Sequence, residues 1–309
     1  MAGSHGGNTA AVTPSWPSAA RAGMAGLCAG LFLAGASSLF PQGPAPSSAP
    51  PITTGLPRTE EILKRAIERA KWVEEQKLDA KYTYTQRTTI DELDSKENVK
   101  RHVERLLQVF PIDGEPYARL IQKDGKPLAE KDAKLEQEHE RKFRERLAER
   151  KRKGESMKKE EEDIEIDEEL IRRYRFVLTG RERVNGRPAY VLSFEPRSKD
   201  LPVKRRIDRL LNKVAGRLWI DEQDYEVSRA DAHLAENVSA WGGLLASVRK
   251  FLLRLEQTKV DETAWMLTLA DGYLDGRILI RSLHMKFNQQ NSGFSRIAPG
   301  SSQPATTRK

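Results

Sequence analysis

Residues 216–234 read GRLWIDEQDYEVSRADAHL, and this stretch decides the fold. Residues 218–220 (LWI) lead into the polar run 221–224 (DEQD), and residues 225–229 (YEVSR) lead out of it. Aromatic and β-branched residues on both sides of a short polar run are typical of two strands joined by a tight turn. The stretch therefore predicts a β-hairpin.

Strand patterns of the same kind recur along most of the chain. Asn185-Gly186 is the strongest short hairpin signal, because both residue types accept the positive φ angles that a two-residue turn requires. We therefore predict a mainly β protein of the α+β class, with about nine or ten strands. Beyond the first hairpin, strand patterns lie at residues 82–88, 99–110, 117–123, 174–183, 188–196, 251–258, 265–270, 277–282 and 283–287, the last two of which directly follow each other.

Two stretches have apolar residues at helical spacing. The first runs from residue 59 to about residue 77, with Glu60 and Glu61 in the first turn, where the helix dipole favours anions. The second spans residues 201–216 and ends at a glycine, which suits a helix C-terminus. Each is predicted to be an amphipathic helix with one apolar face. Residues 129–169 are dominated by Lys, Arg and Glu, and we expect a charged helical insertion at the surface or a partly disordered segment.

The first 36 residues are typical of a secretory signal peptide. Arg21 precedes an apolar run at residues 24–36, which is too short to span a bilayer and ends in small residues that suit cleavage. The only cysteine, Cys28, lies in this run, and Leu27 in front of it does not fit a lipidation site. We expect a non-lipidated protein exported to the periplasm. Initiation at Met24 and an uncleaved membrane anchor remain as alternatives.

Composition divides the rest of the chain. Residues 37–58 are rich in Pro, Ser, Gly and Ala and are expected to form a disordered linker. Residues 59–287 hold the strand and helix patterns and are expected to fold as one domain, with the charged insertion at about 129–169. Residues 288–309 are polar and are expected to form a disordered tail.

The distribution of charge argues against a nucleic-acid partner. The 309 residues carry a formal net charge of +8, but Lys and Arg are mixed with Asp and Glu outside the first 60 residues. A mixed-charge surface is ordinary for a solvated protein, and the basic segments lack aromatic residues on which bases could stack. We expect no nucleic-acid binding, while peripheral contact with a membrane stays open.

No pattern of residues indicates catalysis, a metal site or a cofactor. His102, His233 and His284 stand singly on strand patterns, without the short spacing of metal ligands or a motif for a nucleophile. Asp221 and Asp224 belong to the predicted hairpin turn, where aspartate is favoured for backbone reasons. We therefore expect a binding protein that is not an enzyme and uses no cofactor.

Five segments carry a resemblance to a known family. They are residues 82–84 (YTY), 109–117 (VFPIDGEPY), 180–188, 190–196 and 210–221 (LLNKVAGRLWID). They resemble exported bacterial proteins of the outer-membrane lipoprotein-sorting (LolA/LolB-like) superfamily, which includes the periplasmic carrier and receptor of the Lol system. The resemblance covers roughly residues 59–287. It implies a strongly curved antiparallel sheet, an incomplete β-barrel, covered by amphipathic helices over an apolar cavity that can hold acyl chains.

The resemblance and the apolar strand patterns together indicate where a ligand would bind. The concave face of the sheet is expected to line an apolar cavity, although an ordinary packed core would use the same residues. The two amphipathic helices are expected to form its lid. The candidate cavity residues are Tyr190, Leu192, Phe194, Leu218, Ile220, Phe251, Leu253 and Leu255, and the candidate lid residues are Ile62, Leu63, Ile67, Val203, Ile207, Leu210 and Val214.

These expectations define one main function and one alternative. We expect the protein to bind or carry a lipid or an acylated lipoprotein in the periplasm or cell envelope. An acyl chain gains about 0.8 kcal/mol for each CH₂ removed from water, so no polar binding motif is required. The alternative is an envelope regulator or scaffold that binds a protein partner, with residues 129–169 as the contact element.

Overall fold

The computed structural model describes residues 56–154, 167–198, 200–205, 207–240, 246–278 and 281–297. The predicted signal peptide (1–36) lies outside the described residues, as do most of the predicted linker (37–58) and the last part of the predicted tail.

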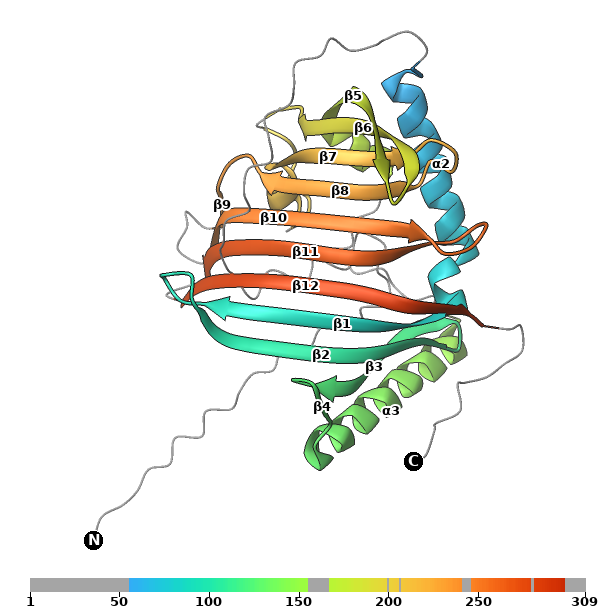
Figure 1. The fold of residues 1–309 in the computed structure, drawn as a ribbon, viewed down its shortest axis with the longest axis vertical. Coiled ribbons are helices and arrows are strands. Elements are labelled where there is room, and N and C mark those ends of the chain that lie inside the picture. The colour runs from blue at the N-terminus through green and yellow to red at the C-terminus, as the bar shows by residue number, and fades with distance from the viewer. Residues whose placement is uncertain are drawn as a thin grey trace.

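A single large antiparallel sheet dominates the structure (Figure 1). Its strand order is β4-β3-β2-β1-β12-β11-β10-β8-β7-β6-β5, and β9 pairs with β10 beside β8. The sheet is not closed, because β4 and β5 form its two edges. The strands are β1 (Tyr82–Leu93), β2 (Val99–Ile112), β3 (Glu115–Lys123), β4 (Lys126–Pro127), β5 (Tyr174–Val184), β6 (Arg187–Pro196), β7 (Val214–Asp221), β8 (Val227–Leu234), β9 (Val238–Ala240), β10 (Ala246–Lys259), β11 (Trp265–Ile278) and β12 (Arg281–Arg296).

Local turn chemistry sets the hairpins. Asn185 and Gly186 join β5 to β6 with φ angles of 50° and 80°, so the turn signal in the sequence is confirmed. Asp113-Gly114 joins β2 to β3 in the same way, with φ angles of 50° and 78°. Turns with two positive φ angles match the right-handed twist of the strands that they connect. The hairpin predicted at residues 216–234 is the pair β7–β8.

The first predicted helix is present as α2 (Thr59–Gln76). It ends at Lys77, whose left-handed φ of 46° leads into the 3-10 helix η2 (Leu78–Lys81). Ile62, Leu63 and Ala66 are buried at the i, i+1 and i+4 positions of one helix face. In Figure 1, α2 runs along one end of the strands, from the β5–β6 side of the sheet towards β12.

The charged segment forms a long helix over its first part. Helix α3 (Glu130–Lys153) buries only Phe143 and Leu147, which pack with Phe110, Ile112 and Tyr117 of β2 and β3. Its remaining surface carries ion pairs between residues one turn apart, such as Arg141–Glu145 and Lys142–Glu138. A further short helix, α4 (Glu168–Arg173), leads directly into β5.

The second predicted helix is wrong over most of its length. Only α5 (Asp208–Leu211) is helical, and Val214 already begins β7. The segment before α5 is held by non-local contacts: Asn212 donates its side-chain N–H to the carbonyls of Leu201 and Pro202. Apolar spacing of three and four residues therefore placed Ile207 and Leu210 on one side correctly, but it did not fix the backbone between them.

The predicted end of the domain at Phe287 is also wrong. The strand β12 continues through Asn288 to Arg296 and pairs with β1 on one side and β11 on the other. Similarly, the strands expected at 277–282 and 283–287 belong to β11 and to a single long β12. The second half of β12 has few apolar residues, so its sequence is typical of a tail. In the structure it pairs with β1, which is also polar, and buried amides take the place of apolar side chains there.

The turn between β10 and β11 is joined to β1 by an aspartate. Burial alone would raise the pKa of Asp261, but the hydroxyl of Tyr82 and the N–H groups of Thr263 and Ala264 donate hydrogen bonds to it and lower its pKa to about 2. A lowered carboxyl pKa stabilises the fold above the unfolded value near 4, and this contribution is lost as the pH falls towards 2.

We therefore expect Asp261 to account for a loss of about 2 kcal/mol in the free energy of unfolding between pH 5 and pH 2. Tyr82→Phe removes one of the hydrogen bonds and should reduce this acid-induced loss. Urea unfolding of both proteins at the two pH values measures the difference. Equal acid-induced losses in the two proteins would contradict the assignment.

Candidate functional site

One row of directly paired residues crosses nine strands and defines the inner face of the sheet. Side chains of directly paired residues point to the same face. From β5 to β11 the row is apolar, and from β12 to β2 it is polar. Its members are Leu178, Leu192, Leu218, Ala230, Leu255, Ala270, Gln289, Thr88 and Arg105, one each from β5, β6, β7, β8, β10, β11, β12, β1 and β2.

In the strand order of the sheet, the row runs from β5 to β2, and β3 and β4 lie beyond its polar end. The register between β2 and β3 shifts at Leu106 and Leu107, next to Arg105. The inner face therefore has an apolar part, which begins at the β5 edge, and a shorter polar part on β12, β1 and β2.

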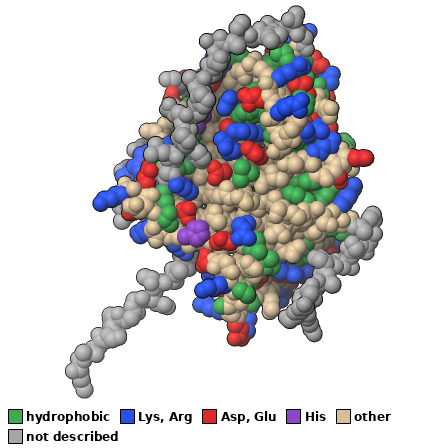
Figure 2. Space-filling view, viewed as in Figure 1, with side chains coloured by type: hydrophobic (Ala, Val, Ile, Leu, Met, Phe, Trp, Pro, Cys, Tyr) green, Lys and Arg blue, Asp and Glu red, His purple; other side chains and the backbone are tan. Residues whose placement is uncertain are grey.

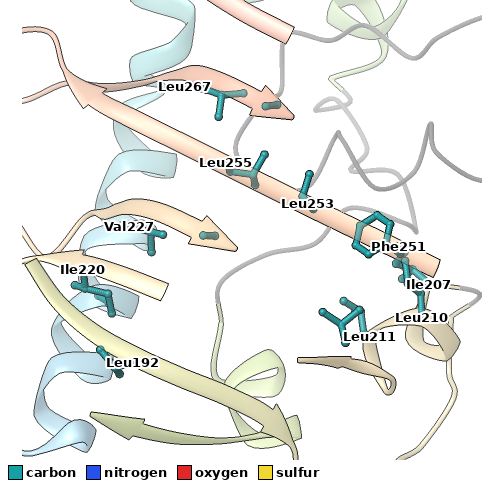
Figure 3. Close-up of a cluster of buried hydrophobic side chains, with 14 of the residues drawn as sticks. Leu192, Ile207, Leu210, Leu211, Ile220, Val227, Phe251, Leu253, Leu255 and Leu267 are labelled. Carbon is teal, nitrogen blue, oxygen red and sulfur yellow. The ribbon is translucent and has the colours of Figure 1, made fainter. Parts of the chain in front are cut away.

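The predicted cavity residues all lie on the apolar part of the inner face. Tyr190, Leu192, Ile220, Phe251, Leu253 and Leu255 belong to one buried cluster, and Phe194 and Leu218 pack against it half-buried. Figure 3 shows Phe251, Leu253 and Leu255 along β10, with Ile207 and Leu210 beside Phe251. The structure thus brings these eight residues together, and it shows a packed cluster of side chains at this place.

The predicted lid residues are divided. Ile62 and Leu63 of α2 belong to the same buried cluster, as do Ile207, Leu210 and Val214. Val214 reaches it from a strand, however, and Ile67 is only half-buried outside the cluster. Val203 is 51% exposed and does not cover the face.

The apolar part of the inner face is not covered evenly. Leu192 and Ile220 are fully buried, whereas Phe176, Leu178, Phe194 and other members of the face are only partly buried. Near the β5 edge, the rings of Tyr174, Phe176 and Phe194 form an aromatic cluster with centroids 5.2–6.1 Å apart. Apolar side chains at this end of the face therefore keep part of their surface in water.

The polar part of the inner face carries buried amides. Gln289 donates to Asn291 Oδ1 at 3.2 Å, and Asn291 donates to the carbonyl of Leu267 at 2.9 Å. Gln86 donates to Thr88 Oγ1 at 3.3 Å, but its Oε1 is buried without a hydrogen-bond partner among the described residues. An unpaired buried oxygen costs free energy, so each such atom needs an explanation.

Arg105 lies directly opposite Thr88 in this polar part. Its side chain is half-buried, and within the described part of the chain it makes no ion pair. Burial, together with the nearby charge of Arg101, lowers the pKa of the Arg105 guanidinium, while Asp124 acts in the opposite sense. Neither Gln86 nor Arg105 was predicted from the sequence, although a glutamine two residues after Tyr84, on the same face of a predicted strand, was a signal that could have found Gln86.

The outer face is occupied by charged side chains that pair with one another. Arg217 and Arg229 each stack over the ring of Trp219, whose indole N–H donates to Glu182 at 2.8 Å. Arg229 also pairs with Asp231 at 2.6 Å. Figure 2 shows Lys and Arg interspersed with Asp and Glu on the face that it presents. These contacts pair charges on the outer face with one another.

The histidines and aspartates noted in the sequence lie in local pairs and turns of the described residues. Among them, no three His, Cys, Asp or Glu side chains come together as metal ligands do, and no helix is long and apolar enough to cross a membrane. His102 and His284 each lie beside one carboxylate, Asp91 and Asp275, on the sheet surface. Asp221 Oδ1 accepts the N–H groups of Gln223 and Asp224, which is the turn role expected from the sequence.

A hollow of about 330 Å³ lies between β11, β12, β1 and β2. It opens on the outer side, because its walls include Arg87, Leu106, Leu269 and Gln290, which pair across the strands on the face opposite to the row. Arg87 is already paired with Glu104 there. This hollow is separate from the predicted cavity.

No protein-family model and no curated protein matches this sequence. The solved structures similar to it include a domain assigned as an outer membrane lipoprotein-sorting protein from Vibrio parahaemolyticus, 14% identical, which covers 80% of this chain and 96% of its own with a TM-score of 0.34. A LolA superfamily protein from Nitrosomonas europaea is 10% identical, with 79% and 95% covered and a TM-score of 0.26. The MucA/MucB complex of Pseudomonas aeruginosa is 12% identical, with 75% and 92% covered and a TM-score of 0.23. Proteins of the predicted lipoprotein-sorting superfamily are thus among its structural neighbours, and at these TM-scores the likeness carries no argument about function.

Proposed function

We propose that the protein binds the acyl chain of a lipid or a lipidated protein on the inner face of its sheet, as a non-enzymatic carrier or receptor. The proposal includes export to the periplasm, which rests on the signal pattern in residues 1–36.

The apolar run of the cross-strand row is the observation that supports this function. Six consecutive members, from Leu178 on β5 to Ala270 on β11, are apolar and share one face. At the β5 end, Leu178, Phe176 and Phe194 are only partly buried, so a flexible apolar ligand could remove more of their surface from water. Each buried CH₂ of that ligand would contribute about 0.8 kcal/mol.

An edge strand offers a matched pair of variants for the test. Leu178 and Val177 are neighbours on β5, but Leu178 points to the inner face and Val177 is 50% exposed on the outer face. Leu178→Asp places a charge where the acyl chain would lie and should weaken binding of tritiated palmitate at least about tenfold. Val177→Asp should leave it unchanged.

Equilibrium uptake of palmitate by the exported full chain measures the effect, with the circular dichroism spectrum confirming that both variants fold. No uptake by the unmodified protein would refute the function. If the Leu178→Asp variant and the unmodified protein bind palmitate with equal affinity, the inner face is not the binding surface.

The protein-partner alternative depends on α3. Its buried apolar side chains, Phe143 and Leu147, are used against β2 and β3, so α3 offers a partner mainly paired charges. Paired surface charges contribute little to affinity. We therefore favour acyl binding. If the protein takes up no palmitate, the protein-partner alternative becomes the favoured function.

A further inference from the structure

We propose that Arg105, Gln86, Thr88 and Gln289 form a head-group site at the polar end of the inner face, which binds an anionic carboxylate or phosphate attached to an acyl chain. This site rests on the proposed function and gives the amphiphile a direction: the acyl chain lies towards β5 and the head group lies over β12, β1 and β2.

The buried oxygen of Gln86 is the first observation behind the site. Gln86 is 4% exposed, and its Oε1 has no hydrogen-bond partner in the part of the chain that the structure describes, while its side-chain N–H donates to Thr88. A buried amide that served only the fold would have both ends satisfied, since an orphaned polar atom destabilises the protein. A hydroxyl or N–H group of a lipid head group would complete it.

Arg105 is an independent second observation. It lies opposite Thr88, and Thr88 lies opposite Gln289, so the three side chains are cross-strand neighbours on one face. Directly paired residues have Cβ atoms about 4.5–5.5 Å apart, which lets one small anionic group contact more than one of them. A half-buried guanidinium without an ion pair in the described chain can gain a charge-assisted, bidentate hydrogen bond from such an anion.

The two ends of the row are far enough apart to separate a head group from its tail. Six strand spacings of about 4.8 Å lie between Gln289 on β12 and Leu178 on β5, or roughly 29 Å along the sheet. The amide side chains begin directly after Ala270, where the apolar run ends. An amphiphile laid across the strands therefore meets apolar side chains along its tail and polar ones at its head.

The charge of Arg105 can be tested with ligands that share one tail. Palmitate, hexadecyl phosphate and neutral hexadecanol have the same tail length, and the unmodified protein should bind at least one anion about tenfold more tightly than the alcohol. Arg105→Gln should abolish this preference while hexadecanol binding stays the same. The matched control is Arg101→Gln, four residues away on the same face, because Arg101 is exposed and already paired with Glu92.

Isothermal titration of the full exported chain supplies these affinities. A preference for palmitate alone would identify a carboxylate head group, and a preference for hexadecyl phosphate alone would identify a phosphate. Equal binding of the alcohol and both anions, or a preference that survives Arg105→Gln, would overturn the head-group site and leave acyl binding intact. Binding of none of the three ligands would overturn the proposed function itself.

Gln86 provides a readout that needs no ligand. Gln86→Leu removes the unpaired buried oxygen and should leave the unfolding temperature of the free protein unchanged or higher. The same variant should show less thermal stabilisation by hexadecanol, whose hydroxyl can donate a hydrogen bond to the Gln86 oxygen. A marked fall in the unfolding temperature of the free Gln86→Leu protein would indicate a purely structural amide and contradict its place in the site.

Discussion

Asp208→Ala should lower the free energy of unfolding by about 3 kcal/mol, because it leaves the buried guanidinium of Arg173 with only the exposed carboxylate of Glu169 as a counter-charge. Asp208 is fully buried, and Arg173, with 6% of its side chain exposed, lies 3.1 Å from it. Asp208 also accepts the backbone N–H groups of Lys204 and Arg205 at 2.9 and 3.0 Å. Burial raises the pKa of Asp208, but these hydrogen bonds and Arg173 outweigh it and keep the pKa below its ordinary value.

Unfolding in guanidinium chloride measures this loss of stability, and an exposed ion pair supplies the control. Glu168 pairs with Arg172 one turn away on α4, with 63% of its side chain exposed, so Glu168→Ala should cost less than about 0.5 kcal/mol. A double variant, Arg173→Met with Asp208→Leu, should recover much of the loss because both charges are then absent. A cost below about 1 kcal/mol for Asp208→Ala alone would show that water reaches Arg173.

Arg69→Met should cost about 3 kcal/mol at pH 8, because it leaves the carboxylate of Glu226 buried beside α2. The two side chains are 16% and 13% exposed and lie 2.8 Å apart, and Arg69 also donates to the carbonyl of Thr263 at 2.6 Å. These contacts hold α2 to the turns β7–β8 and β10–β11. The effect is therefore a measure of how firmly α2 is held against the end of the inner face.

The cost of Arg69→Met should also depend on pH. Burial already raises the pKa of Glu226 despite Arg69, and loss of Arg69 raises it further. A carboxyl group whose pKa is higher in the folded state than in the unfolded state loses stability as the pH rises above the unfolded value near 4.5. The cost should therefore be smaller at pH 5 than at pH 8.

Urea unfolding at the two pH values checks this sign, and Arg69→Met with Glu226→Gln should recover most of the stability at pH 8. Lys64→Met is the control on the same helix, since Lys64 and Glu68 are exposed and 3.9 Å apart. A cost that is equal at pH 5 and pH 8 would mean that Glu226 does not titrate in this environment.

The proposed binding surface was only partly accessible to sequence reasoning. Alternation within β10 predicted that Leu253 and Leu255 share a face, and alternation within β6 did the same for Tyr190 and Leu192, because side chains of a strand point alternately to opposite faces. Which strands lie side by side is set by pairing across the sheet. The meeting of Thr88 with both Gln289 and Arg105 therefore had no signal within any single segment.

The sequence by itself determined the local elements: the hairpin turns at Asn185-Gly186 and Asp113-Gly114, the strand alternation and the buried face of α2. These features follow from φ preferences and spacing within a few residues. Only the tertiary structure decided that the helix at Asp208 is a single turn and that β12 continues through its polar half. The reason is that both outcomes depend on distant partners. Arg173 pairs with Asp208 in the first case, and β1 satisfies the backbone of β12 in the second.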